Sequence, residues 1–294
     1  MKSKSLKTWW LAARPKTLWA SISPVIIGTA MAYGDGKVHW PSAILAAFSA
    51  VFIQIGTNYA NDYFDFLKGA DREERLGPTR VTQAGLVTLQ AIKWATIIVF
   101  TLAFLTGLYL IYRGGWPILL IGVFSILFGI LYTGGPFPLG YYGLGDIFVL
   151  IFFGVVAVGG TYYVQALSIN QYVIISGLAP GLFSTGILTV NNLRDIQLDK
   201  IAGKKTLAVR FGETFARLEY IFSVSIACLI PVWLFYKVPD QPFVLLASLV
   251  LFFALPSMKI VLAKKPGKIL NQVLADTGRL LLLYSVIFAI GWNL

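Results

Sequence analysis

Carboxylate and amide side chains gather in two short stretches of the sequence, each at the end of an apolar segment long enough to cross a membrane. Within each stretch two aspartates stand three or four residues apart, so a helix would carry both on one face. Oxygen donors of this kind suit a hard divalent cation, above all Mg²⁺. The predicted cation ligands, of which Asp65 and Asp195 form the predicted catalytic pair, are Asn58, Asn61, Asp62, Asp65, Asp71, Asn191, Asn192, Asp195 and Asp199.

Basic side chains accompany both stretches and indicate a phosphate-bearing ligand. Mg²⁺ usually shares its coordination shell with substrate phosphates, and Lys and Arg bind phosphate oxygens directly. In a membrane setting this combination favours a substrate with a diphosphate head and a lipid tail. The alternative is a solvated face on which acids and bases form only surface ion pairs. The predicted diphosphate-binding residues are Lys68, Arg72, Arg80, Arg194, Lys204 and Lys205.

The overall composition predicts an integral membrane protein. Of the 294 residues, 57% are hydrophobic and 13% are charged, whereas soluble domains carry about a quarter charged residues. We expect one all-α, polytopic membrane domain over residues 1–294, with no separate soluble domain and no cleavable signal peptide. The net charge of +11 does not indicate nucleic-acid binding in so apolar a chain, and topology and anionic lipid explain it better. A single cysteine, Cys228, and a single histidine, His39, argue against disulfides, zinc sites and histidine catalysis.

Nine apolar segments of about 20 residues predict a bundle of nine transmembrane helices. With a cytoplasmic N-terminus, all but three of the 24 basic residues fall on the cytoplasmic side, as the positive-inside rule requires. Both acidic stretches then face the cytoplasm, and the expected location is the cytoplasmic (inner) membrane. The spans are predicted to begin near Thr17, Pro41, Ala91, Trp116, Gly145, Tyr172, Phe215, Phe243 and Leu274.

The two acidic stretches also form a faint internal repeat. Each ends a span and precedes a basic loop that contains glycine, and the two spans lie four apart in the predicted order. An even separation means that the two helices run in the same direction and meet at one face. Duplicated halves of membrane proteins often hold the binding site at their interface.

These residues resemble the two aspartate-rich motifs of the UbiA superfamily of intramembrane aromatic prenyltransferases. The resemblance is nearest to the menaquinone branch, because Gly69 stands where the wider superfamily has an aspartate and Asp71 supplies that carboxylate instead. It covers the first six spans and the following loop, whereas the last three spans match mainly in hydropathy and length. The segments that carry it are Arg14-Pro15-Lys16-Thr17, Asn58-Tyr59-Ala60-Asn61-Asp62-Tyr63-Phe64-Asp65, Lys68-Gly69-Ala70-Asp71, Gly77-Pro78-Thr79-Arg80, Tyr142-Gly143-Leu144-Gly145-Asp146, Asn191-Asn192-Leu193-Arg194-Asp195 and Ala202-Gly203-Lys204-Lys205-Thr206-Leu207.

The resemblance implies a Mg²⁺-dependent transfer of a polyprenyl group from polyprenyl diphosphate to an aromatic acid. In the menaquinone branch the acceptor is 1,4-dihydroxy-2-naphthoate, which loses CO₂ and gives a demethylmenaquinone. Metal-assisted departure of diphosphate needs neither histidine nor cysteine. The predicted acceptor contacts are Arg14 and Lys16, for which anchoring the first span is the alternative, and Tyr132 and Tyr142, for which packing is the alternative.

Asp146 stands at the cytoplasmic mouth of the fifth predicted span. An ionisable residue near membrane depth is usually functional, but aspartate is also a common helix cap. We expect Asp146 to cap the helix, with a role in the site as the alternative.

Three other functions compete with this interpretation. A related enzyme would keep the metal and diphosphate half of the site and use 4-hydroxybenzoate, homogentisate or a tetrapyrrole as acceptor. Membrane phosphotransferases of phospholipid synthesis also bind metals with aspartates, but those aspartates lie within one stretch. A cation-coupled transporter would place carboxylates near the bilayer centre rather than at the ends of spans.

Overall fold

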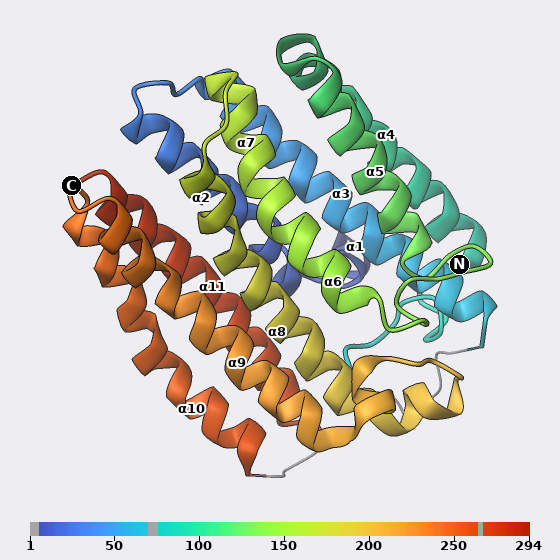
Figure 1. The fold of residues 1–294 in the computed structure, drawn as a ribbon. Helices are drawn as coiled ribbons and strands as arrows, with labels where there is room; N and C mark the ends of the chain where they lie inside the picture. The colour runs from blue at the N-terminus through green and yellow to red at the C-terminus, as the bar shows by residue number, and fades with distance from the viewer. Residues whose placement is uncertain (1–5, 70–75, 264–266) are drawn as a thin grey trace.

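The computed structural model describes residues 6–69, 76–263 and 267–294, and every regular element within these ranges is helical (Figure 1). The predicted site residues Asp71 and Arg72 lie outside the described residues. The elements in chain order are α1 (Leu6–Ala13), η1 (Pro15–Thr17), α2 (Trp19–Gly34), α3 (Trp40–Leu67), α4 (Leu89–Gly114), α5 (Trp116–Leu131), α6 (Gly145–Leu150), η2 (Ile151–Val156), α7 (Ala157–Ala166), α8 (Gln171–Ile201), α9 (Leu207–Lys237), η3 (Pro242–Leu249), α10 (Val250–Leu262) and α11 (Leu270–Trp292).

The prediction of an all-α membrane bundle is confirmed. Within the described ranges, seven helical segments are long and apolar enough to cross a membrane, and α5 is a shorter apolar helix. Together with the 16-residue α2 they correspond to the nine predicted spans, with α6, η2 and α7 forming one continuous segment and η3 continuing into α10. The largest difference is at α9, which begins at Leu207 rather than near Phe215. Gly212, at φ 87°, kinks this helix, so a first short turn precedes the apolar span.

Polar side chains cap several of these helices. The Thr88, Asn170 and Thr206 side chains each accept a hydrogen bond from a backbone N–H in the first turn of α4, α8 and α9. His39 does the same for α3, because its ring nitrogen accepts from the Ser42 N–H at 3.3 Å. The single histidine is therefore a structural cap.

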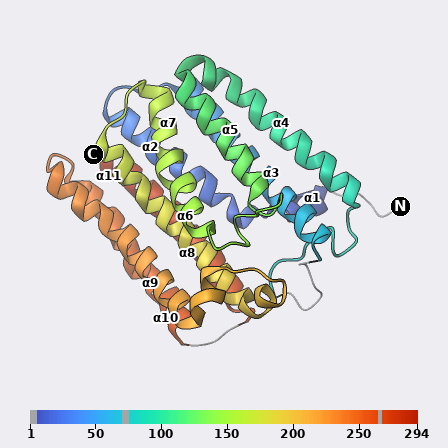
Figure 2. The ribbon, with the colours of Figure 1, turned by 45° about the vertical axis from the view of Figure 1, so that its right-hand side comes forward.

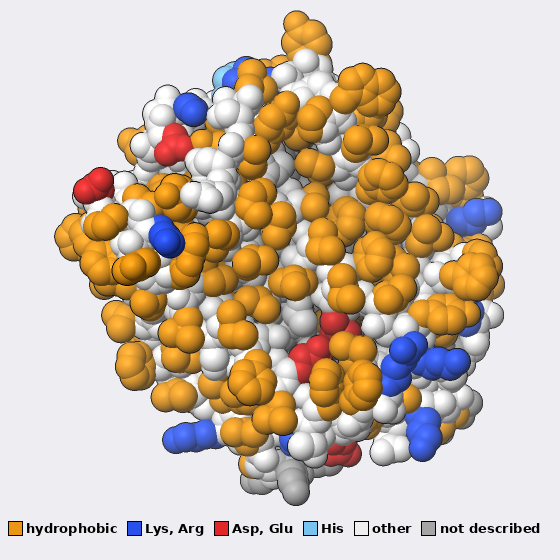
Figure 3. Space-filling view, in the orientation of Figure 1, with side chains coloured by type: hydrophobic (Ala, Val, Ile, Leu, Met, Phe, Trp, Pro, Cys, Tyr) orange, Lys and Arg blue, Asp and Glu red, His pale blue; other side chains and the backbone are white. Residues whose placement is uncertain are grey.

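The helices that carry the two acidic stretches, α3 and α8, run in the same direction (Figures 1 and 2). The loops that follow α3, α5 and α8 gather at one end of the bundle, where α1 also lies. Of the apolar window of α8, 67% is buried, against 17% for α4, so α8 is central and α4 is peripheral. On the face seen in Figure 3, apolar side chains cover the middle and Lys and Arg side chains lie towards the ends.

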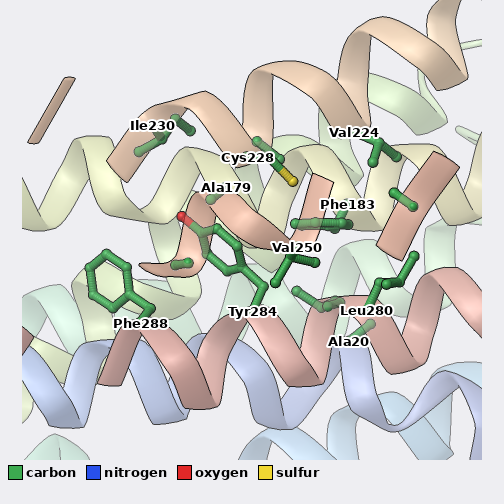
Figure 4. Close-up of a cluster of buried hydrophobic side chains, with 14 of the residues drawn as sticks. Ala20, Ala179, Phe183, Val224, Cys228, Ile230, Val250, Leu280, Tyr284 and Phe288 are labelled. Atoms are coloured by element: carbon green, nitrogen blue, oxygen red, sulfur yellow. The ribbon is translucent and has the colours of Figure 1, made fainter. Parts of the chain in front are cut away.

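The main core packs α8 against α9 and α11, and α2 packs against both α8 and α11. Phe183 of α8 lies against Tyr284 of α11, with ring centroids 5.4 Å apart, and Cys228 is buried beside them (Figure 4). Glycines bring η2 onto α8, since a Cβ on Gly154 would lie 2.5 Å from the Gly177 carbonyl oxygen. This close contact fixes the position of α6 next to the acidic end of α8.

The prediction that Asp146 caps α6 is wrong. Leu144 occupies the capping position without a side-chain hydrogen bond, and Asp146 is the second residue of the helix. The Asp146 side chain is buried, and its Oδ1 atom has no hydrogen-bond partner within the part of the chain that the structure describes.

Candidate functional site

Both acidic stretches line one polar cavity of about 210 Å³. The last two turns of α3 and the last three turns of α8 supply the oxygen donors. The segments before α2, after α3 and after α8 supply cations. The predicted site residues that line this cavity are Arg14, Asn61, Asp65, Arg80, Tyr132, Asn191, Asn192, Asp195, Asp199 and Lys204.

Arg80 joins the two carboxylates of the first stretch. Its Nη1 atom donates to Asp62 Oδ1 at 2.6 Å, and its Nη2 atom donates to Asp65 Oδ2 at 2.8 Å. The three side chains are almost wholly buried. The adjacent Val81 N–H donates to the second oxygen of Asp62 at 3.2 Å, so the loop after α3 is held tightly against the helix.

Asp62 and Asn58 hold the segment that precedes α2. The Arg14 guanidinium donates to Asp62 Oδ1 at 2.7 Å. The backbone of Arg14 is left-handed, with φ 51°. The Asn58 amide donates to the Ala13 carbonyl at 2.9 Å and to the Thr17 hydroxyl at 3.2 Å. These bonds place the Arg14 side chain at the rim of the polar cavity.

The second stretch has its own buried arginine. Arg194 forms two hydrogen bonds with the carboxylate of Asp195 and a third with the Asn191 oxygen at 2.6 Å. Its remaining nitrogen donates to Asn271 of α11 at 2.7 Å. Asn271 in turn donates to the Leu76 carbonyl at 2.7 Å, which ties the loop after α3 to α11. Arg194 therefore orients one wall of the cavity from behind.

Tyr141 links the two halves of the site. Its hydroxyl donates to Asp65 Oδ1 at 2.9 Å, and the ammonium groups of Lys68 and Lys204 lie 4.7 and 4.8 Å from its ring centroid. Lys204 also lies 3.6 Å from Asp199 and 3.8 Å from Asp65. The pKa of Lys68 is lowered by its partial burial and by Lys204, against an opposing effect of Asp65.

A second, apolar cavity of about 360 Å³ continues from the polar one between α3, α4, α5 and the α6–α7 segment. Tyr132, directly after α5, lines both cavities. Burial raises the pKa of its phenol, and the charges of Asp146, Asp199 and Asp65 raise it further, so the phenol keeps its proton at neutral pH. The residues common to both cavities, which we call the neck, are Ala20, Gln54, Asn61, Tyr132, Val149 and Phe153.

Several predicted site residues of the described ranges lie elsewhere than on the polar cavity. Asn58 lines the apolar cavity, and Asp62 and Arg194 lie behind the polar wall. The Lys68 ammonium donates to the Thr133 carbonyl at 2.6 Å. The remaining predicted residues outside the cavity are the exposed Lys16, Tyr142 and Lys205.

The oxygen donors of the polar cavity suit Mg²⁺, because they are carboxylates and amides from two facing helices. Within residues 6–69, 76–263 and 267–294, no three His, Cys, Asp or Glu side chains are grouped closely enough to hold an ion alone. A cation here would therefore share its shell with oxygens of the substrate, as Mg²⁺ commonly does with phosphates.

Sequence reasoning missed Tyr141, Gln54, Thr133 and Ser184, all of which line the polar cavity. Tyr141 is next to the predicted Tyr142, and Thr133, which donates to Asn61 Oδ1 at 2.8 Å, follows the predicted Tyr132. A signal for Gln54 was available, because a polar amide within an apolar span is unusual. Ser184 is too common a residue in membrane helices to stand out.

Comparison with known proteins gives a consistent picture. A model of the UbiA prenyltransferase family matches residues 21–275. A 1,4-dihydroxy-2-naphthoate octaprenyltransferase of Haemophilus influenzae is 36% identical over 305 aligned positions, which cover 99% of this chain and 97% of that protein. A protein of the same name from Escherichia coli is 42% identical over 76% of this chain and 75% of its own length.

A solved structure of a UbiA homolog from Archaeoglobus fulgidus, bound to GPP and Mg²⁺, has the same fold. The TM-score is 0.67 at 17% identity, and the match covers 98% of this chain and 100% of that one.

Proposed function

This chain belongs to the UbiA prenyltransferase family, and we propose that it transfers a polyprenyl group from polyprenyl diphosphate to 1,4-dihydroxy-2-naphthoate. The reaction releases diphosphate and CO₂ and gives a demethylmenaquinol, the hydroquinone form of a demethylmenaquinone. The names of the relatives from Haemophilus influenzae and Escherichia coli support the naphthoate as acceptor. The acceptors 4-hydroxybenzoate and homogentisate are the alternatives within the family.

One observation carries the proposal: a cavity lined by carboxylates and cations opens into an apolar cavity inside a membrane bundle. The polar part suits a diphosphate and the apolar part suits an isoprenoid tail. The neck between them is where the first carbon of the tail would lie. A transporter site would not need this division into a charged end and an apolar end.

When bound, Mg²⁺ would neutralise the diphosphate and make it a better leaving group. We assign its protein ligands to Asp65, Asp195 and Asp199, with amide oxygens from Asn61, Asn191 and Asn192. Arg14, Arg80 and Lys204 would bind diphosphate oxygens. Asp62 and Arg194 act as positioning residues, because their bonds orient Arg14, Arg80 and Asp195.

The bond between the allylic carbon and the diphosphate oxygen breaks with its electron pair on the diphosphate. The neck then shields the allylic cation from water, and the faces of Tyr132 and Phe153 stabilise it. The electron-rich ring of the acceptor attacks, and a new carbon–carbon bond forms. Loss of CO₂ from the same ring carbon leaves its electron pair in the ring and restores aromaticity.

The membrane orientation is part of the proposal. The distribution of basic residues supports an N-terminus and a site at the cytoplasmic face of the cytoplasmic membrane. Both substrates are amphiphilic, so they can reach a site at the membrane surface.

The test is an acceptor panel on the purified protein with Mg²⁺ and a polyprenyl diphosphate. We expect pyrophosphate release and a prenylated naphthol with 1,4-dihydroxy-2-naphthoate, and no product without Mg²⁺. The Asp65→Asn and Asp195→Asn variants, which preserve side-chain size, should each lose at least about 100-fold in kcat, the loss of a major electrostatic contact.

Turnover of 4-hydroxybenzoate but not of the naphthoate would overturn the acceptor and leave the prenyl transfer standing. Full activity of a variant that carries both substitutions would overturn the proposed metal and diphosphate site.

A further inference from the structure

Two polar side chains lie deeper in the bundle than the carboxylates and occupy equivalent positions on the two acidic helices. Gln54 precedes Asp65 by eleven residues on α3, and Ser184 precedes Asp195 by eleven residues on α8. Eleven residues bring a helix back to almost the same face about 16 Å along its axis. Both side chains line the same polar cavity as the carboxylates, so they form a second polar level within it.

Ser184 lacks the hydrogen bond that a helical hydroxyl normally makes. The Thr185 and Thr189 hydroxyls donate to carbonyls four residues earlier, at 3.1 and 2.9 Å. The Ser184 hydroxyl is buried and has no hydrogen-bond partner within the described part of the chain, although it too is preceded by a helical carbonyl four residues earlier. A buried hydroxyl on a cavity wall costs free energy unless a ligand or a water molecule forms a hydrogen bond with it.

Gln54 is also buried, with 8% of its surface exposed. Its Nε2 atom lies 3.4 Å from the Thr17 hydroxyl, a long hydrogen bond. That contact engages the amide nitrogen and leaves the amide oxygen to accept a hydrogen bond from a ligand. Gln54 belongs to the neck, where the polar cavity meets the apolar one.

We propose that Gln54 and Ser184 together bind the second ring hydroxyl of the aromatic acceptor, the one that a monohydroxy ring lacks. The inference rests on the proposed function and adds the residues that distinguish a 1,4-dihydroxy ring from a monohydroxy ring. The carboxylates and cations occupy the cytoplasmic level, so a hydroxyl at the second level needs neutral partners. An amide and a hydroxyl meet this need without burying another charge.

The experiment compares the KM for 1,4-dihydroxy-2-naphthoate with the inhibition constant of 1-hydroxy-2-naphthoate, which lacks the second hydroxyl. We expect Gln54→Leu and Ser184→Ala each to raise the KM about tenfold, the value of one good hydrogen bond. The inhibition constant of the monohydroxy compound should change by less than about twofold in either variant. The substitutions change the protein and not the two compounds, so a change in the ratio of the two constants reports a change in binding of the second hydroxyl.

Ser176→Ala is the matched control. Ser176 also lies on α8 with a buried, unpaired hydroxyl in the described ranges, but it lies away from the cavities. This variant should leave both constants unchanged.

Equal changes in the two constants, or no change in either, would overturn the assignment of Gln54 and Ser184 while wild-type turnover keeps the proposed function intact. Absence of wild-type turnover with the naphthoate would instead overturn the proposed function and, with it, this inference.

Discussion

Arg80 is the residue on which both carboxylates of the first acidic stretch converge. Its guanidinium forms short bonds to Asp62 and Asp65 in a buried setting, and it also lines the polar cavity. A buried ion pair adds little net stability, but removal of one partner leaves an uncompensated charge. Arg80 therefore combines a structural role with the binding of diphosphate that we propose for it.

Arg80→Ala should destabilise the protein by about 3–5 kcal/mol, because Asp62 and Asp65 lose their shared partner. Arg80→Lys keeps the charge, but lysine lacks the planar guanidinium that bonds to both carboxylates at once. We therefore expect a loss of stability between that of Arg80→Ala and zero. Thermal unfolding in detergent, with and without a polyprenyl diphosphate, measures both effects. An unchanged midpoint in Arg80→Ala would contradict this role.

We expect both the hydroxyl and the ring of Tyr141 to contribute to kcat/KM. Tyr141→Phe removes the bond to Asp65 and keeps the ring beside Lys68 and Lys204, so kcat/KM should fall only about tenfold. Tyr141→Leu also removes the cation–π contacts, each worth about 0.5–1 kcal/mol at exposed sites. Its kcat/KM should therefore be lower than that of Tyr141→Phe. Steady-state kinetics with varied polyprenyl diphosphate separates the two variants. Equal losses in both would assign the whole effect to the hydroxyl.

At the scale of elements, α4 and α5 form one side of the apolar cavity. Gly107 of α4 and Gly122 of α5 line this cavity, and a Cβ at either position would meet no atom within 4 Å. These glycines therefore leave width for a ligand rather than permit a close helix contact. The space that they leave should influence which prenyl chains fit.

Gly122→Leu should lower kcat/KM for a long polyprenyl diphosphate about tenfold and leave geranyl diphosphate nearly unchanged. The added side chain narrows the apolar cavity, and overpacking costs about 1–3 kcal/mol for a chain that must pass it. Gly122→Ala adds one methyl group and should give a smaller effect in the same direction. Competition between a short and a long donor, read by mass spectrometry, measures the shift; an unchanged product ratio would contradict it.

At the scale of the whole molecule, α3 and α8 bring the two acidic stretches to one end of the bundle. The positive-inside rule then predicts which end faces the cytoplasm. Cys228 is the single cysteine of the chain and is buried, so cysteine labelling can test the orientation with little background.

In a Cys228→Ala background, Lys200→Cys at the acidic end should react with an impermeant maleimide only in inside-out vesicles. Lys37→Cys at the opposite end should react only in right-side-out vesicles. Both lysines are exposed, so access does not depend on local opening. The reverse labelling pattern would overturn the orientation of the site.

The sequence alone determined the all-helical membrane bundle, the nine spans and the family, because these depend on local properties of the chain. Apolar length defines a span, and residue spacing places Asp62 with Asp65, or Asp195 with Asp199, on one helix face. The bundle and the family are confirmed. The kink at Gly212 and the failure of Asp146 to cap α6 required the backbone itself.

Only the tertiary structure decided which of the predicted residues share the cavity. Arg80 and Arg194 look equivalent in the sequence, yet Arg80 lines the cavity and Arg194 lies behind it, bonded to Asp195 and Asn271. Tyr141 and Tyr142 are neighbours, and the loop turns only Tyr141 towards Asp65. Such differences depend on packing between elements far apart in the chain. The spacing of charges along the sequence does not encode them.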